Sequence, residues 1–194
     1  MSRALRYPVV LASASPRRQE LLRSLVPLFD VVPADLDEDA LTDADPWVTA
    51  QRLAREKCLA VFASHPESLV IGGDTVVALP LGDDWVQLTK PVDVEDAVRI
   101  LSSLQGATHT VITGVCLRWP KGMVAFTESS KVTFRSVSEA EIRAYIATGD
   151  PMDKAGAYGL QGGAKDFIAK VEGSVTNVIG LPMERLEEAL REVK

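Results

Sequence analysis

Residues 11–22 read Leu-Ala-Ser-Ala-Ser-Pro-Arg-Arg-Gln-Glu-Leu-Leu, and the expected fold builds outward from this stretch. The apolar residues Val9 and Val10 precede it and predict a short strand, which the small residues then end. Pro16 fits the first position of a helix without losing a hydrogen bond, and Ser15 before it is a favoured N-cap. We therefore expect a strand, a small-residue loop and a helix in direct succession.

Two arginines, Arg17 and Arg18, fall in the first turn of that helix, where the helix dipole disfavours positive charge. A bound anion would offset this conflict, because a helix N-terminus also offers unpaired N–H groups. We interpret the segment as a cradle for a polyphosphate. The alternative is a solvated pair of arginines or one paired with surface carboxylates, since so short a motif also occurs by chance.

The composition excludes several classes of protein. With 194 residues, 46% hydrophobic and 25% charged, the chain is typical of a soluble globular protein. Its net charge of −6 argues against a general nucleic-acid binder, which usually carries a basic stripe. No apolar run approaches the roughly 20 residues that cross a bilayer, and the N-terminus lacks the apolar segment of a secretory signal. We expect a cytoplasmic protein that contacts neither nucleic acid nor membrane.

Cysteine and histidine usage points the same way. Cys58 and Cys116 lie in apolar segments and are interpreted as small core residues rather than a disulfide, which suits a reducing compartment. The chain has only two histidines, His65 and His109, and no cysteine pair at ligand spacing. A zinc site is therefore not expected.

Helical and strand patterns alternate along the rest of the chain. Helices are predicted over 47–62, 93–104 and 138–148 and from residue 182 onward; strands are predicted over 29–33, 69–77, 109–119, 123–135 and 167–171, with a turn or hairpin tip over 80–89. Some strands follow helical crossovers and others follow hairpins, which predicts an α/β fold with a mixed sheet flanked by helices. No repeat or flexible linker interrupts residues 1–194, so we expect a single domain.

Asp74 interrupts the apolar run 69–77, between Gly73 and Thr75. A carboxylate buried there needs a cation, a metal or an exit at an edge. It is either a structural residue that caps a turn or a functional acid, and the glycines favour the second because they leave space for a ligand.

Other charged residues are ambiguous by sequence. Lys57 and Lys90 resemble ordinary solvated lysines, and the acidic run 35–39 resembles a solvated turn. The run could instead supply oxygen ligands to Mg²⁺, which prefers a few carboxylates together with substrate phosphates.

Residues 153–163, Asp-Lys-Ala-Gly-Ala-Tyr-Gly-Leu-Gln-Gly-Gly, are glycine-rich and predict a binding loop with little role in core packing. Gln161 in this segment carries both a donor and an acceptor, as reading the edge of a base requires. An irregular connection whose glycines serve only turns is the alternative.

Seven segments occur together and in order as in one known family: Ser13–Arg18 (Ser-Ala-Ser-Pro-Arg-Arg), Arg55–Lys57, Gly73–Thr75, Lys90–Pro91, His109–Gly114 (His-Thr-Val-Ile-Thr-Gly), Asp153–Gln161 and Val178–Pro182. The chain resembles the Maf family of nucleoside triphosphate pyrophosphatases from about residue 11 to residue 190. The form of residues 153–161 is similar to the branch that hydrolyses dTTP and UTP rather than the branch that acts on 7-methyl-GTP.

The resemblance assigns roles residue by residue. It implies that Asp74 is the general base. It implies three positions that govern substrate choice: Arg17, Thr75 and Gln161. It implies four positions around the phosphates: Ser13, Arg18, Lys57 and Lys90. It implies a divalent metal, Mg²⁺ or Mn²⁺, with two ligands: Asp74 and Glu38.

The family resemblance also implies a fold and an assembly: a mixed α/β structure like that of inosine triphosphate pyrophosphatase, with a cleft between two lobes, and a homodimer. One departure is visible. The segment between Val77 and Lys90 is longer than the compact family turn, and Thr89 replaces the usual glycine before Lys-Pro.

Two other functions stay open at this point. One is a pyrophosphatase that prefers modified pyrimidine or non-standard purine triphosphates. The other is a nucleotide-binding regulator of cell division or septum formation. The catalytic hypothesis requires the paired arginines to lie near Asp74.

Overall fold

The structure, a computed structural model, describes residues 5–194. Residues 1–4, part of the N-terminal stretch in which we expect no secretory signal, lie outside the described residues. The described residues divide into two compact units, one formed by 5–74, 113–128 and 180–194 and the other by 75–112 and 129–179. Three long strands contribute residues to both units: β3 (Leu69–Leu81), β5 (Thr108–Trp119) and β6 (Gly122–Phe134).

Within residues 5–194, the strands form one mixed sheet of seven, in the order β2-β1-β3-β5-β6-β7, with β4 paired to β3. The remaining strands are β1 (Val9–Leu11), β2 (Asp30–Val31), β4 (Asp84–Leu88) and β7 (Ile168–Glu172). β1 pairs parallel with both β2 and β3, whereas β3–β4 and β6–β7 are antiparallel. The predicted α/β fold with a mixed sheet is therefore confirmed.

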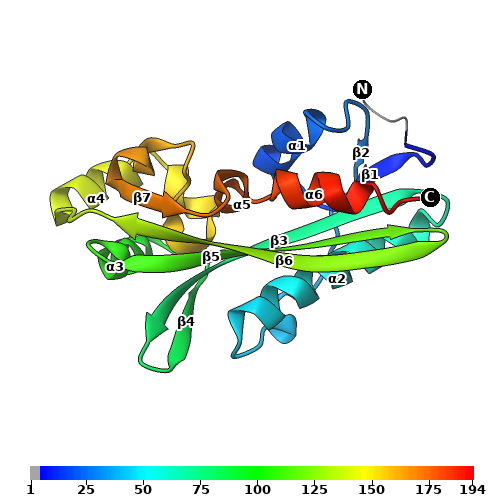
Figure 1. Cartoon of the computed structure of the whole chain (residues 1–194). Helices are drawn as coiled ribbons and strands as arrows, with labels where there is room; N and C mark the ends of the chain where they lie inside the picture. Colours follow the sequence, from blue (N-terminus) through cyan, green and yellow to red (C-terminus); the bar gives the residue numbers. More distant parts are fainter. Residues whose placement is uncertain (1–4) are drawn as a thin grey trace. The chain divides into compact units, whose positions relative to one another are not determined.

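In the first unit, helices cover both faces of the sheet. Alternation along β1 sends Val9 and Leu11 into a core with α1 (Pro16–Arg23) and α6 (Met183–Leu190), and Val10 into a core with α2 (Pro46–Ser64). Figure 1 shows α1 and α6 on one side of these strands and α2 on the other. Cys58 and Cys116 are free, buried and in the same core, as the sequence predicts.

Two glycines let α2 approach the sheet backbone to backbone. A Cβ on Gly114 of β5 would lie 2.1 Å from the carbonyl oxygen of Ala50, and one on Gly72 of β3 would lie 2.4 Å from that of Ala54. Real side chains do not tolerate such distances, so any larger residue would push the helix away. The close fit fixes the depth of α2 over the strands that it covers.

The second unit has its own core, formed by α3 (Val94–Leu104), α4 (Glu139–Ile146), the strand residues Val111 and Phe134, and part of segment 153–163. The N-terminus of α4 carries the predicted capping box, in which Ser138 and Glu141 bond reciprocally. These hydrogen bonds lower the pKa of Glu141 to about 2, with Arg135 adding to the effect.

Several element boundaries differ from the sequence prediction. β3 runs past Val77 to Leu81 and pairs with β4, so the expected turn over 80–89 contains a strand hairpin whose turn is formed by Gly82 and Asp83. The apolar alternation continues past Val77 with Leu79, which packs against the second core. A short helix, α5 (Val175–Ile179), was not predicted, because five residues are too few to show a helical period.

Candidate functional site

The start of α1 has the local structure that the sequence predicts. The Ser15 hydroxyl accepts from the backbone N–H of Arg18 at 3.4 Å, and Pro16 opens the helix. Ser13, buried in the preceding loop, turns its hydroxyl toward the same residue, because Nη1 of Arg18 donates to Ser13 Oγ at 3.0 Å. The strand, loop and helix therefore bring a hydroxyl, a guanidinium and the helix N-terminus together.

Arg18 is held by groups from distant parts of the sequence. Its Nε donates to the carbonyl oxygen of Gly180 at 2.8 Å, and its side chain lies over Gly73, where an added Cβ would be 3.4 Å from Nε. Burial lowers the pKa of Arg18, and the negative charge of Asp74 acts in the opposite direction. The guanidinium stays charged, because arginine keeps its proton in proteins, and it faces the field of this acid. The expected proximity of the paired arginines to Asp74 is present for Arg18.

Asp74 finds its cation on α2. Lys57 Nζ lies 2.7 Å from Asp74 Oδ1 and 2.8 Å from Glu38 Oε1, so one ammonium joins two carboxylates. The Lys57 and Asp74 side chains are each only 12% exposed, whereas Glu38 is 48% exposed. Lys57 is therefore not the solvated lysine that it resembles by sequence, and the 35–39 run contains one acid that turns toward the site.

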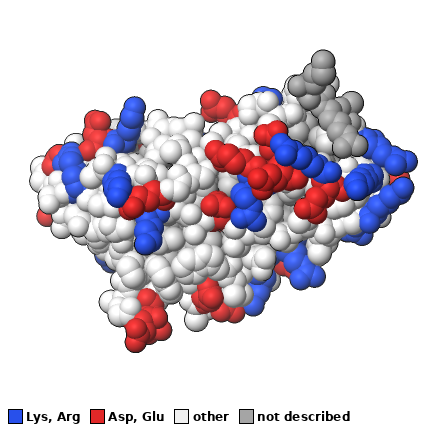
Figure 2. Space-filling view, viewed as in Figure 1, with Lys and Arg blue, Asp and Glu red and all other residues white. Residues whose placement is uncertain are grey.

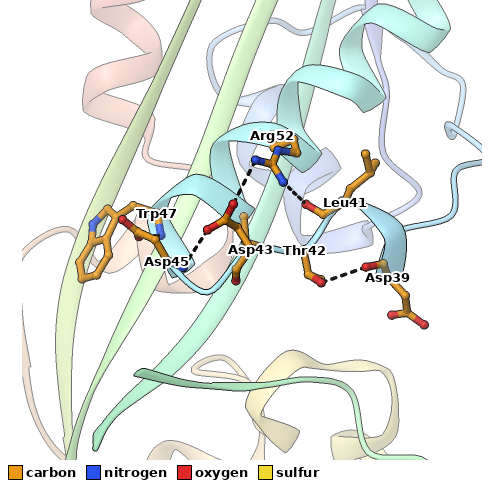
Figure 3. A network of polar contacts seen from close by, with 8 residues as sticks. Asp39, Leu41, Thr42, Asp43, Asp45, Trp47 and Arg52 are labelled. Atoms are coloured by element: carbon orange, nitrogen blue, oxygen red, sulfur yellow. Dashed lines mark hydrogen bonds and ion pairs between the residues drawn. The ribbon is translucent and has the colours of Figure 1, made fainter. Parts of the chain in front are cut away.

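The segment that carries Glu38 is fastened to α2 by a second network (Figure 3). Arg52 donates to the carboxylate of Asp43 at 3.1 Å and to the carbonyl oxygen of Leu41 at 3.4 Å. The buried hydroxyl of Thr49 also accepts from the backbone N–H of Asp43 at 2.9 Å. The sequence does not mark Arg52 and Thr49 as parts of a network, because neither arginine nor threonine at these helix positions signals a distant partner.

Three candidate residues belong to the second unit. Thr75 is half-buried and follows Asp74 on β3, Lys90 is exposed just after β4, and Gln161 is exposed in a turn. Arg17, in the first unit, is half-buried in the first turn of α1 beside Arg18. Their roles rest on the resemblance rather than on contacts described here.

The segment 153–163 is more buried than its glycine content predicts, and the expectation that it takes little part in core packing is wrong. It forms short 3-10 turns, η3 (Ala155–Ala157) and the start of η4 (Gly163–Phe167). Ala157 and Tyr158 lie inside the second core. The glycines serve close packing, since a Cβ on Gly156 would lie 2.9 Å from Val77 Cγ1. Gln161 nevertheless stays exposed.

The donors near Lys57 fit a metal that arrives with phosphate ligands. Within residues 5–194, no group of three or more His, Cys, Asp or Glu side chains is placed to hold an ion. Asp74 and Glu38 supply two carboxylates that share Lys57 as a neighbour. Mg²⁺ is commonly held by one or two carboxylates plus substrate phosphates and water, so this donor set suits it better than a cation that needs a complete protein cage.

The charges on the face shown in Figure 2 are mixed in sign. Over α6, basic and acidic side chains are interspersed (Figure 2), with Arg185 paired to Glu128 and Arg191 to Glu187. In the described part of the chain, no helix is both long and apolar enough to cross a membrane.

Comparisons with known proteins show the family of this chain. A family model described as Maf-like protein matches residues 8–193. Proteins named dTTP/UTP pyrophosphatase from Koribacter versatilis and Aquifex aeolicus are 47% and 41% identical to it, covering 94% and 95% of this chain and 93% and 95% of theirs. The Staphylococcus aureus Ham1 protein, a solved structure, is similar with a TM-score of 0.48 and 13% identity over 66% of this chain and 71% of that one. The extent of the family match and the identity of these relatives show that the chain belongs to the Maf-like protein family.

Proposed function

We propose that this chain is a nucleoside triphosphate pyrophosphatase that hydrolyses dTTP and UTP to the monophosphate and pyrophosphate. The observation that carries the proposal is the acid on β3: Asp74 is buried, paired with Lys57 at 2.7 Å, and in the field of Arg18. Relatives of that name match nearly the whole chain, and neither of the two alternative functions has comparable support.

The reaction adds water across the bond between the α and β phosphates. Asp74 accepts a proton from water as the oxygen attacks the α-phosphorus, and the bond from that phosphorus to the bridging oxygen breaks. Pyrophosphate leaves with the bonding pair. Because Asp74 Oδ1 accepts from Lys57, Oδ2 is the oxygen assigned to the water. General-base assistance of this kind contributes roughly 10²–10⁴-fold in rate.

The phosphates carry most of the substrate charge, and cations are assigned to them. Arg18 offers a guanidinium already oriented by Ser13 and Gly180, and it lies in the first turn of α1, at the positive end of the helix dipole. Ser13, Lys57 and Lys90 complete the set of proposed phosphate-binding residues. Positioning and charge stabilisation supply most of the catalysis in reactions at phosphate.

Base selection is assigned to Arg17, Thr75 and Gln161. The exposed amide of Gln161 offers one acceptor and two donors, which suits the edge of a pyrimidine. Each assignment is tested by its own substitution against a panel of UTP, dTTP, CTP and purine triphosphates.

A divalent metal, Mg²⁺ or Mn²⁺, is assigned to Asp74 and Glu38. When bound with the triphosphate it would neutralise charge on the phosphate oxygens. Lys57 keeps the two carboxylates at one place before substrate arrives, since both lie within 2.8 Å of its ammonium. We further assign the enzyme to the cytoplasm as a homodimer.

The decisive experiment uses Asp74→Asn, which keeps the shape of the side chain and removes its basicity. Wild-type protein should release pyrophosphate from dTTP and UTP with Mg²⁺ or Mn²⁺, and the variant should lose roughly 10²–10⁴-fold in kcat while it still binds nucleotide. Absence of hydrolysis of any triphosphate by the wild type would overturn the enzyme proposal. A variant that loses turnover but keeps a cellular effect on division would instead favour the regulatory function.

A further inference from the structure

The second unit buries a polar pair that the proposed chemistry does not use. His109, at the start of β5, is fully buried, and its Nε2 lies 2.7 Å from the hydroxyl oxygen of Tyr158. Both rings pack edge to face against Phe134, with centroids 5.2 Å and 4.9 Å away. Aliphatic side chains would fill this space without having to lose hydration, so the two polar groups need a reason beyond packing.

The electrostatic state of the pair is neutral. Burial lowers the pKa of His109 to about 4 and raises that of Tyr158, so neither side chain carries charge near neutral pH. Among the described residues, His109 Nδ1 has no hydrogen-bond partner, so the bond to Tyr158 is the polar contact that holds the imidazole.

Tyr158 connects this core to Gln161. Just before Tyr158, the backbone is in the left-handed region at Gly156, with φ of 71°, and at Ala157, with φ of 57°. After Tyr158 the chain turns outward, and Gln161 is exposed three residues later. Tyr158 is thus the last buried side chain before the residue assigned to base reading.

We propose that Tyr158 and His109 are positioning residues that fix the segment 158–161 and, through it, the Gln161 amide. This inference rests on the proposed function, in which Gln161 reads the base. Aromatic packing restrains the plane of the Tyr158 ring, and the hydrogen bond to His109 fixes how far the ring enters the core. A recognition group tolerates an error of only about half an ångström, so a small shift of this ring would loosen base selection.

The test compares Tyr158→Phe, which removes one hydroxyl and keeps the ring, with the wild type and with Gln161→Ala. The measured quantity is the ratio of kcat/KM for UTP to that for CTP. Loss of one neutral hydrogen bond corresponds to roughly a fivefold change, so we expect the ratio to fall by about that factor in Tyr158→Phe. In the Gln161→Ala background, Tyr158→Phe should change the ratio no further, because its effect passes through Gln161.

Tyr7→Phe is the matched control. The Tyr7 hydroxyl donates to the main-chain oxygen of Lys194, and both residues belong to the first unit, whereas Tyr158 and Gln161 belong to the second. It removes a phenolic hydrogen bond and should leave the UTP-to-CTP ratio unchanged. A second readout needs no nucleotide: hydrogen–deuterium exchange of a peptide over 157–163 should be faster in Tyr158→Phe than in Tyr7→Phe.

The outcomes separate the two proposals. If the wild type hydrolyses UTP but Tyr158→Phe keeps both the wild-type ratio and the wild-type exchange, the positioning role is wrong and the proposed function stands. Additive effects of Tyr158→Phe and Gln161→Ala on the ratio would also overturn it. If the wild type hydrolyses no triphosphate, the proposed function fails, and this inference fails with it.

Discussion

Each unit contains a buried polar pair whose two atoms lie 2.7 Å apart, but the two pairs differ in charge. Lys57 and Asp74 form an ion pair in which each side chain is 12% exposed, with Glu38 as a third, more exposed member. His109 and Tyr158 are neutral and more deeply buried. The ion pair keeps charge available where a charged substrate would bind, whereas the neutral pair holds a segment in place without charge.

Removing one partner of the ion pair should have the largest effect. Lys57→Met leaves the buried Asp74 carboxylate without its cation, which costs about 3–5 kcal/mol when a buried pair is broken. Urea unfolding should show this loss, and adding Asp74→Asn should restore part of it because the unpaired charge is removed. A double variant no more stable than Lys57→Met would show that the charge of Asp74 is not the cause.

The second-largest effect on the free energy of unfolding is expected when acid protonates His109 of the neutral pair. The folded-state pKa of His109 is lowered to about 4, against an unfolded value near 6.5, so the unfolded chain binds the proton more tightly. The contribution of His109 to the free energy of unfolding is therefore fully present above pH 6.5. It falls as the pH drops, by about 3 kcal/mol at pH 4.

The measurement compares unfolding free energies of wild type and His109→Phe from pH 7 to pH 4. Other groups also titrate in this range, so the relevant quantity is the difference between the two profiles. That difference should shrink by about 3 kcal/mol toward pH 4. His65→Asn, at the chain's other histidine, is the control. Parallel profiles of wild type and His109→Phe would contradict the assignment.

The hydrogen bond inside the neutral pair should be worth less. His109→Phe leaves the Tyr158 hydroxyl buried without its partner, a penalty of roughly 1–3 kcal/mol. Tyr158→Phe in that background removes the unsatisfied hydroxyl, so the double variant should be more stable than His109→Phe alone. A double-mutant cycle measures this coupling, and a coupling near zero would mean that the 2.7 Å contact adds nothing.

The smallest effect is expected for Arg52, whose ion pair with Asp43 has side chains 41% and 37% exposed. Arg52→Ala should lower the free energy of unfolding only slightly, with the loss falling as salt rises. Arg52→Ala should also lower the activity by weakening the contribution of Glu38, because Arg52 fastens the segment that carries Glu38. Arg55→Ala, an exposed arginine on the same helix, is the control.

Local signals in the sequence predicted much of the fold. The N-cap at Ser15 and the capping box at Ser138 depend on neighbours only three residues away, and both were confirmed. The mixed sheet followed from the alternation of helical and strand patterns. The hairpin of β3 and β4 was placed only roughly, because polar and turn-forming residues at 82–84 hide strands whose pairing is a tertiary property.

The contacts of the candidate site were harder to predict. Lys57 and Asp74 are 17 residues apart and His109 and Tyr158 are 49 apart, so no local pattern marks either pair. Family resemblance identified Lys57, Asp74 and Glu38 as site residues but not that Lys57 pairs with both carboxylates. It gave no reason for His109, and the glycines of 153–163 suggested exposure although several of them serve close packing.

The bond from Arg18 to the Gly180 carbonyl spans 162 residues of sequence. A ribosome therefore synthesises the guanidinium long before the oxygen that orients it. Until translation passes Gly180, the nascent chain lacks this acceptor. The proposed phosphate site is thus complete only once residue 180 has been synthesised.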